Sequence, residues 1–95
     1  MLGVIATLRI KPGANAEFEK AMGELQKAVR ANEPGNKLYV LHKTDDPTVY
    51  VMLERYENQA ALEAHRASTH FKTLGAALGP HMAGRPEVKI MEEVS

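Results

Sequence analysis

Two histidines stand close together in the segment EAHRASTHFKTLG, residues 63–75, and imidazole is the side chain best suited to proton transfer near neutral pH. His65 and His70 lie five positions apart, with Ser68 between them. Side chains that share one face of a helix are three or four positions apart. We therefore predict either a helix break between the two histidines or separate roles for them.

His65 follows Ala61 and Leu62 by four and three positions, which places it on the apolar face of a short predicted helix. Two interpretations are open. The imidazole can be a core-edge group that is hydrogen-bonded to a backbone carbonyl or to a carboxylate such as Glu54. It can also be a general base in a pocket between helix and sheet, because a neutral imidazole accepts a phenolic proton at neutral pH.

His70 falls in the first turn of the helix that Ser68 is predicted to cap, where the helix dipole disfavours a protonated imidazole. It either contacts an oxyanion or faces solvent. A helix break could also bring His65 and His70 together as metal ligands, but their spacing matches no standard motif, so no metal is predicted. The sequence also lacks a phosphate-binding Gly-rich loop, an HExxH pair and a GxSxG elbow.

Other polar and aromatic residues could complete a pocket around an imidazole. Glu54 interrupts the apolar strand pattern VYVMLERY, so its carboxylate is buried with a partner, lies at an interface or is exposed. Tyr39 is a strand tyrosine, for which sheet packing is the more common role. A pocket for a flat aromatic ligand also needs an apolar lining, and the candidates for that lining are Met22, Phe71 and Leu74.

The composition limits the classes of function that the protein can have. The 95 residues suit a single domain, residues 1–95. Twelve Lys and Arg balance twelve Asp and Glu, so no net field attracts nucleic acid or an anionic membrane. The absence of cysteine excludes disulfides and thiolate metal sites and fits a reducing cytoplasm. The first residues lack the pattern of a signal peptide, and no apolar run approaches the ~18 residues of a membrane span.

The predicted elements follow the order β-α-β-β-α-β. Alternating apolar residues in LGVIATLRI predict a strand over residues 2–10, and a stripe of apolar side chains predicts an amphipathic helix over residues 14–31. KLYVLHK and TVYVMLERYE predict two strands joined by the hairpin TDDPT. Asn58 and Ser68 are the predicted N-caps of two short helices. EVKIMEEV is the last predicted strand, and its inward side chains are predicted to be Val88, Ile90 and Val94.

This order is that of the ferredoxin-like α+β fold, in which helices cover one face of a four-stranded antiparallel sheet. The other face of the sheet would then be exposed, and Tyr50, Met52 and Met91 are predicted to lie on it. Large apolar faces are usually covered in the functional assembly. A second copy of the same sheet is the simplest cover, so we predict a homodimer.

Taken together, these segments resemble a known family. EPGNKLYVL, residues 33–41, and DPTVYVMLERYENQAALEAHRASTHFK, residues 46–72, are similar to the antibiotic biosynthesis monooxygenase family, and most similar to its quinol-monooxygenase-like branch. The shared pattern is EPG with an aromatic residue, a hairpin, E-x-Y/W, a short helix with A-L-x-x-H, and S-x-H-F. VIATLRIKPGANAEFEKA fits the opening of the family, so the resemblance covers essentially the whole chain.

The resemblance implies a dimeric α/β barrel, in which two sheets face each other with the helices outside. It also implies a pocket in each subunit where an electron-rich phenol, quinol or anthrone reacts with O₂ without metal, flavin or haem. His65 and His70 match the histidines of the family, and Tyr39 and Glu54 match its strand positions. The haem-degrading branch instead carries a tryptophan at the position of His65 and a haem-ligating histidine at that of Gly75. This chain has no tryptophan, so haem degradation is disfavoured.

Two functions of different classes follow from these residues and this resemblance. The first is a cofactor-independent monooxygenase that oxidises a quinol or a polycyclic phenol with O₂, with His65 as base and His70 or Tyr39 orienting the oxyanion. The second is a non-enzymatic dimer of the same fold, which binds a small apolar metabolite or acts in a stress response. In that second function the histidines are structural.

Overall fold

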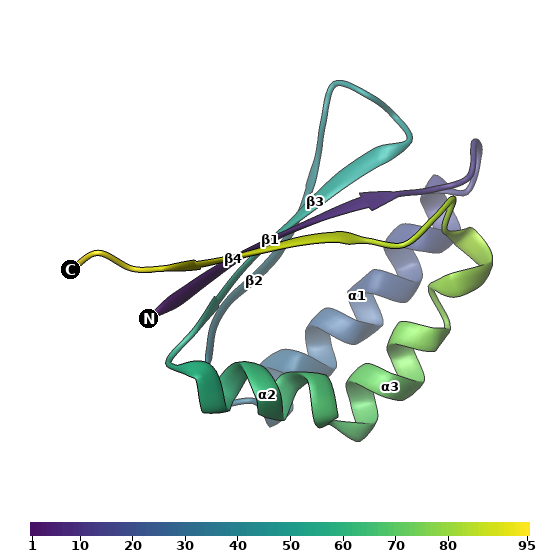
Figure 1. The fold of residues 1–95 in the computed structure, drawn as a ribbon. Helices are drawn as coiled ribbons and strands as arrows, with labels where there is room; N and C mark the ends of the chain where they lie inside the picture. Colours follow the sequence, from purple (N-terminus) through teal and green to yellow (C-terminus); the bar gives the residue numbers. More distant parts are fainter.

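The computed structural model describes residues 1–95, and its elements follow the predicted order (Figure 1). The strands are β1 (Leu2–Arg9), β2 (Asn36–Lys43), β3 (Val49–Tyr56) and β4 (Glu87–Glu92). The helices are α1 (Asn15–Asn32), α2 (Gln59–Ala67) and α3 (Thr69–Ala76), followed by a 3₁₀ turn at Gly79–His81. An isolated bridge between Ile10 and Met82 ties the segment after α3 to the end of β1.

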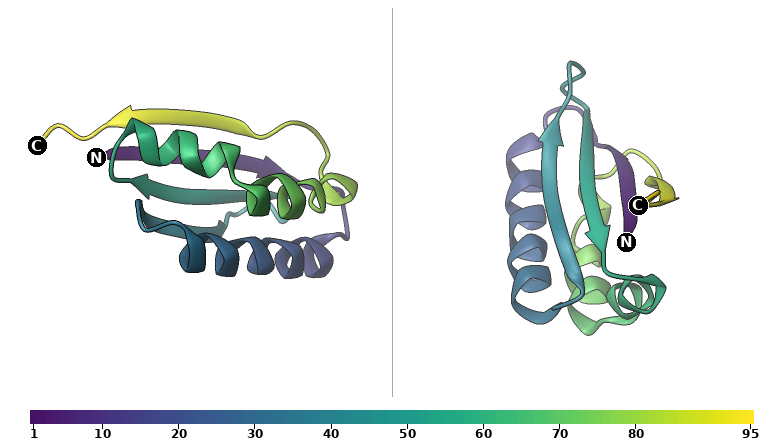
Figure 2. Two further views of the ribbon diagram at one scale, coloured as in Figure 1. Left: turned by 90° about the horizontal axis from the view of Figure 1, so that it is seen from below. Right: turned by 90° about the vertical axis from the view of Figure 1, so that its left-hand side faces the viewer.

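The four strands form one antiparallel sheet in the order β2-β3-β1-β4, and the helices cover one of its faces (Figure 2). On the central strand β1, Val4 lies opposite Glu54 of β3 and Ile90 of β4. Because side chains alternate along a strand, these three residues share one face of the sheet. The predicted ferredoxin-like α+β fold is confirmed, and the sheet remains open within the chain.

Helix α1 packs on the sheet through the apolar stripe that its sequence predicts. Phe18, Met22, Leu25 and Val29 are all buried. The ring of Phe18 packs against Tyr50 of β3, with the two centroids 4.8 Å apart. Full burial of a side chain of this size contributes roughly 1.5–3 kcal/mol, so this stripe is a main source of stability in a small domain.

The chain between the two histidines breaks at Ser68. Its backbone is extended there, and its Oγ accepts a hydrogen bond from the backbone N–H of Phe71 as the N-cap of α3. The same hydroxyl donates to the carbonyl of His65 at the end of α2. Asn58 caps α2 by accepting from the N–H of Ala61. Both predicted caps are confirmed, and the two histidines lie on different helices.

The prediction of which β3 side chains face away from the helices is wrong. Tyr50 and Met52 are buried on the helix-covered face, because they pair with Leu8 and Ala6 on the buried face of β1. Of the three side chains predicted to lie on the outer face, only Met91 does so. A shift of one residue in register exchanges the two faces of a strand, and the pairing with β1 decides which face is which.

The outer face of the sheet carries a different apolar set, which is half-buried in the single chain: Ile5, Val40, Val51 and Leu53. On the inner face of β4, Val88 and Ile90 point toward the helix side as predicted. They remain 53% and 44% exposed because β4 is an edge strand. Val94 was predicted to point inward, but it lies beyond the end of β4 and is exposed.

The EPG turn, residues 33–35, passes close to α2. A Cβ atom built on Gly35 would lie 2.6 Å from the Cβ of Ala61, nearer than real side chains approach. Ala61 and His65 are one helical turn apart on the same face of α2. The missing side chain at Gly35 therefore lets the turn that carries Glu33 approach the face of α2 that carries His65.

Gly35→Ala is expected to lower the free energy of unfolding by about 1–3 kcal/mol, because the added methyl group overpacks this contact. Gly23→Ala is the matched control on α1, where an added Cβ meets nothing within 4 Å. The control is expected to raise the free energy of unfolding by about 0.5–1 kcal/mol through its better helix propensity. Urea denaturation of both variants measures the effects, and equal effects would contradict the close approach at Gly35.

Candidate active site

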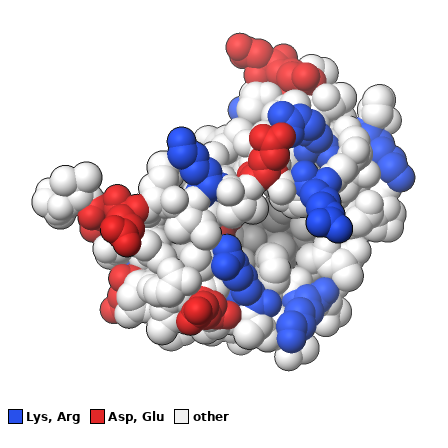
Figure 3. All heavy atoms as spheres, in the orientation of Figure 1, with Lys and Arg blue, Asp and Glu red and all other residues white.

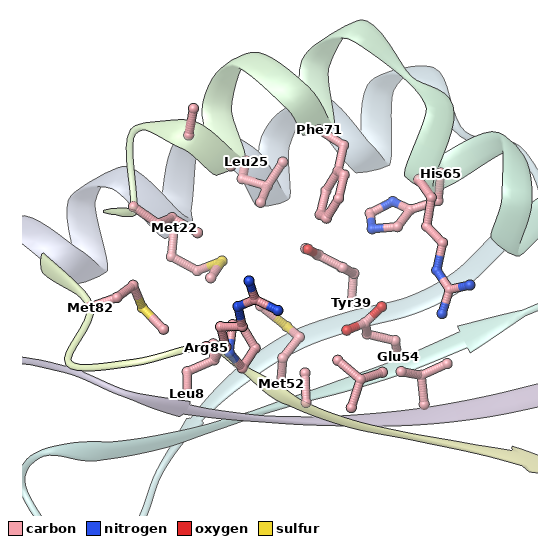
Figure 4. A pocket seen from close by; sticks show the side chains of 18 of the residues that line it. Leu8, Met22, Leu25, Tyr39, Met52, Glu54, His65, Phe71, Met82 and Arg85 are labelled. Atoms are coloured by element: carbon pink, nitrogen blue, oxygen red, sulfur yellow. The ribbon is translucent and has the colours of Figure 1, made fainter. Parts of the chain in front are cut away.

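A cavity of about 740 Å³ lies between the sheet and the helices, within the size range of small-molecule sites. It opens as a hollow on the face of the molecule in Figure 3. Its walls come from all four strands, from the three α-helices, and from the segment between α3 and β4. Most of the lining is apolar, and the large apolar side chains include Leu8, Leu25, Met22, Met52, Phe71 and Met82 (Figure 4).

Glu33, the residue directly after α1, joins the two histidines. Its two carboxylate oxygens lie 2.9 and 3.0 Å from Nδ1 of His65. Nε2 of His70 donates a hydrogen bond to one of the same oxygens and lies 3.2 Å from the hydroxyl oxygen of Ser68. The Glu33 side chain is only 8% exposed. One buried carboxylate thus holds both imidazoles, which explains why two histidines at an unfavourable helical spacing belong to one cluster.

Three aromatic rings surround the imidazole of His65. Its centroid lies 4.5 Å from that of Phe71, 5.3 Å from that of Tyr56 and 5.4 Å from that of Tyr39. Burial among these rings lowers the pKa of His65 below 6.5, and the hydrogen bond and charge of Glu33 oppose the shift only in part. The imidazole is therefore neutral at pH 7, with the Nδ1–H donating to Glu33 and Nε2 carrying the lone pair.

Two polar atoms at this end of the cavity have no hydrogen-bond partner within the chain: Nε2 of His65 and the hydroxyl of Tyr39. No fully enclosed side-chain nitrogen or oxygen of the protein lacks a partner, so both atoms remain open to the cavity. In Figure 4 the two side chains converge from α2 and β2 beside Phe71. Burial raises the pKa of Tyr39, so its hydroxyl stays a hydrogen-bond donor.

Glu54 of β3 lies at the same end of the cavity and is 8% exposed. One of its oxygens accepts a hydrogen bond of 2.6 Å from the Tyr56 hydroxyl. Burial raises the pKa of Glu54 to about 7, against the opposing effects of Tyr56 and of the Arg66 charge. Of the partners that the sequence leaves open for His65, a backbone carbonyl or a carboxylate such as Glu54, the structure shows a carboxylate, and it is that of Glu33.

Most of the predicted site residues meet in this cavity, namely Met22, Tyr39, Glu54, His65 and Phe71. His70 does not line the cavity and instead binds the Glu33 carboxylate. Leu74, a predicted substrate contact, packs against the apolar core instead.

Sequence reasoning misses Glu33 and three basic residues of the lining, Arg66, Lys72 and Arg85. The signal for Glu33 was present, since EPG directly follows an amphipathic helix and precedes a strand that carries Tyr39. The three basic residues look like ordinary solvated charges in the sequence. Only the fold shows that they border one cavity.

The Glu33, His65 and His70 cluster is held by hydrogen bonds between its own members. No group of three or more His, Cys, Asp or Glu side chains is placed to hold a metal ion. None of the helices combines the length and the apolar character that crossing a membrane requires.

The fold and the site define a ferredoxin-like α+β protein whose apolar cavity ends at a buried Glu–His pair, a tyrosine and a second carboxyl group. Residues 1–77 match the sequence profile of the family described as antibiotic biosynthesis monooxygenase. The chain belongs to this family, as the resemblance in its sequence predicts.

Individual relatives agree with this assignment. A crystal structure from Caulobacter crescentus CB15, described as that of a "putative antibiotic biosynthesis monooxygenase", has a TM-score of 0.95 and 42% sequence identity, and the match covers 99% of this chain and 90% of that chain. The Bacillus subtilis (strain 168) protein named "Putative monooxygenase YcnE" is 26% identical over 95 residues, which cover 100% of this chain and 99% of that protein. The Mycobacterium tuberculosis protein named "Putative monooxygenase Rv0793" is 31% identical over 78 residues, which cover 82% and 76%.

Glu54→Gln is expected to change how stability depends on pH. The folded-state pKa of Glu54, about 7, lies above the ordinary value of 4.5, so the folded protein binds this proton more tightly than the unfolded chain. The stability that this proton contributes is complete below pH 4.5 and is lost as the pH rises through 7. The whole shift corresponds to at most about 3 kcal/mol. Relative to wild type, the variant should therefore gain about 1–3 kcal/mol between acidic and mildly alkaline pH.

Urea denaturation at the two ends of this pH range measures the gain. Glu63→Gln, which replaces an exposed carboxylate on α2, is the matched control. A Glu54→Gln stability curve that runs parallel to that of wild type would contradict a buried, proton-binding carboxyl group.

Proposed function

We propose that the protein is a monooxygenase that oxidises a quinol or a polycyclic phenol with O₂ and needs no metal, flavin or haem. The observation that carries the proposal is the convergence of Nε2 of His65 and the Tyr39 hydroxyl, both without protein partners, at one end of an apolar cavity. Membership of the family and the names of the relatives support monooxygenation as the reaction class.

His65 is the general base of this proposal. Its Nε2 accepts the phenolic proton, and the Glu33 carboxylate on Nδ1 fixes the tautomer and stabilises the imidazolium that forms. Tyr39 donates a hydrogen bond to the phenolate oxygen. The apolar lining keeps water away from the anion, which strengthens both interactions. Glu33 is a positioning residue, since it acts through His65.

The reaction balances without an external reductant. A quinol and O₂ give a hydroxyquinone and water, and an anthrone and O₂ give an anthraquinone and water. In both cases one oxygen atom enters the ring system, the other leaves as water, and the substrate supplies all four electrons. Deprotonation makes the substrate the electron donor, so the protein needs to provide a base, a hydrogen-bond donor for the anion and a dry cavity.

We also propose that two copies pair through the outer faces of their sheets. Leu53 of β3 lies between Ile5 of β1 and Val40 of β2 at the centre of this face. The face is apolar and only half-buried in the single chain. Pairing removes this surface from water and builds the two-sheet barrel that the family resemblance implies.

Oxygen uptake by the metal-stripped protein, measured against a panel of quinols and anthrones, tests the proposed chemistry. Wild type is expected to consume O₂ faster than the autoxidation seen without protein, and chelators should not slow it. His65→Gln is expected to lower kcat/KM by at least ~100-fold, because it removes the general base. His81→Gln is the matched control, because His81 lies in the 3₁₀ turn and does not line the cavity.

Uptake that His65→Gln retains in full would remove His65 from the mechanism. Uptake no faster than autoxidation across the whole panel would contradict the enzyme and favour the non-enzymatic binding dimer. Circular dichroism of each variant separates loss of chemistry from loss of fold.

Analytical ultracentrifugation tests the pairing of sheets. Wild type is expected to sediment at micromolar concentration as a dimer of the 10.5 kDa chain. Leu53→Lys places a charge at the centre of the outer face and should weaken the dimer by at least ~10-fold, because the burial of an unpaired charge is costly. Glu63→Lys adds a lysine on the exposed side of α2 and should leave the dimer intact. A monomeric wild type would contradict the proposed pairing.

A further inference from the structure

Three basic side chains line the cavity outside any ion pair. Arg66 lies on α2, Lys72 on α3 and Arg85 in the segment before β4; all three are exposed, and none takes part in an ion pair. In contrast, Arg9 and Arg55 on the sheet are each paired with a glutamate. Figure 3 shows Lys and Arg side chains on several sides of the hollow.

These basic residues are concentrated around the cavity, whereas the formal net charge of the whole chain is zero. Glu54 is the one carboxylic acid in the lining, and its raised pKa lowers its negative charge near neutral pH. The cavity therefore combines an apolar wall with a positive rim. Such a site attracts a ligand that is itself apolar in its body and anionic at one end.

Arg85 is the basic residue of the lining that lies nearest in the chain to β4. Figure 4 shows its guanidinium group inside the cavity, over Met52 and between the labelled side chains of the two walls. A guanidinium group without a protein partner can offer two parallel N–H donors to a carboxylate. Arg85 is exposed and takes part in no ion pair, so its guanidinium group is free to do so.

The strand register places Arg85 away from the polar end of the cavity. Glu54 is level with Val4 on β1, whereas Val88 is level with Ala6, and Arg85 precedes Val88 by three residues. Arg85 lies between Glu87, which is level with Thr7, and Met82, which is level with Ile10. At about 3.3 Å per residue, it is therefore about 10–20 Å along the sheet from the level of Glu54. The long Arg85 side chain reaches back over part of this span. A ligand that touches both ends therefore needs a body longer than a single ring.

We propose that the substrate is an aromatic acid: a phenol or quinol of at least two rings, with a carboxylate remote from the reacting hydroxyl, and that Arg85 binds this carboxylate. The position of the reacting hydroxyl rests on the proposed function, but the binding of the anion does not. Arg66 and Lys72 strengthen the attraction at longer range. Val88 and the methionines pack against the rings between the two ends.

The test compares the binding of 6-hydroxy-2-naphthoate with that of its methyl ester, by fluorescence titration near neutral pH and at low ionic strength. The two probes share rings and hydroxyl and differ in charge. The acid is expected to bind at least ~10-fold more tightly, the scale of a charge-assisted hydrogen-bonded pair, and added salt should reduce the preference. Arg85→Gln should remove most of the preference by weakening the acid and leaving the ester unchanged.

Lys20→Gln is the matched control, because it removes the same charge from an exposed position on α1 that does not line the cavity. It should retain the preference for the acid. Equal affinities for acid and ester in wild type would overturn the inference, and so would a preference that survives in Arg85→Gln or a failure of both probes to bind.

The titration consumes no oxygen, so the two proposals can fail separately. A protein that binds the acid through Arg85 but oxidises no quinol would refute the proposed monooxygenase and leave the anion site standing. A protein that oxidises neutral quinols but shows no preference for the acid would refute the anion site alone.

Discussion

The burial of the Glu33 carboxylate is the constraint on which the site depends. A carboxylate that is 8% exposed needs hydrogen-bond donors to offset its lost hydration, and the two imidazole N–H groups provide them. On a continuous helix, two residues five apart point about 140° away from each other. One carboxylate could not reach both. Two features of the backbone therefore make the cluster possible. The helix break at Ser68 turns His70 toward the carboxylate, and the close approach at Gly35 brings the turn that carries Glu33 next to α2.

This cluster gives His65 a structural role, to which the proposed function adds a chemical one. Its Nδ1–H anchors α2 to the end of α1 through Glu33, which any core histidine could do. The other nitrogen and the Tyr39 hydroxyl have no partner within the chain, whereas every enclosed side-chain nitrogen and oxygen has one. Unpaired polar groups in an apolar setting cost free energy. In the proposed function, a bound substrate pairs with both of these groups.

The sequence predicts correctly those elements that depend on residues close together in the chain. The stripe of α1 and the side-chain caps at Asn58 and Ser68 depend on residues a few positions apart, so their spacing reveals them. The direction of Tyr50 and Met52 is not a local property, because β3 is largely apolar on both faces and only its pairing with β1 assigns them. The bond from residue 33 to residues 65 and 70, like the gathering of basic residues around the cavity, exists only after the chain has folded.

The cavity also affects the stability of the whole domain. A small chain buries only a small hydrophobic core. The core of this protein is divided into a large cluster under α1 and a small cluster of Val4, Tyr56 and Leu62. His65 lies between the two clusters, since its ring contacts Tyr39 of the first cluster and Tyr56 of the second. The cavity is lined by side chains of both clusters, so the proposed aromatic substrate would contact both. A ligand that binds only the folded chain adds its binding free energy to the stability of the fold, so the proposed substrate would stabilise the domain that binds it.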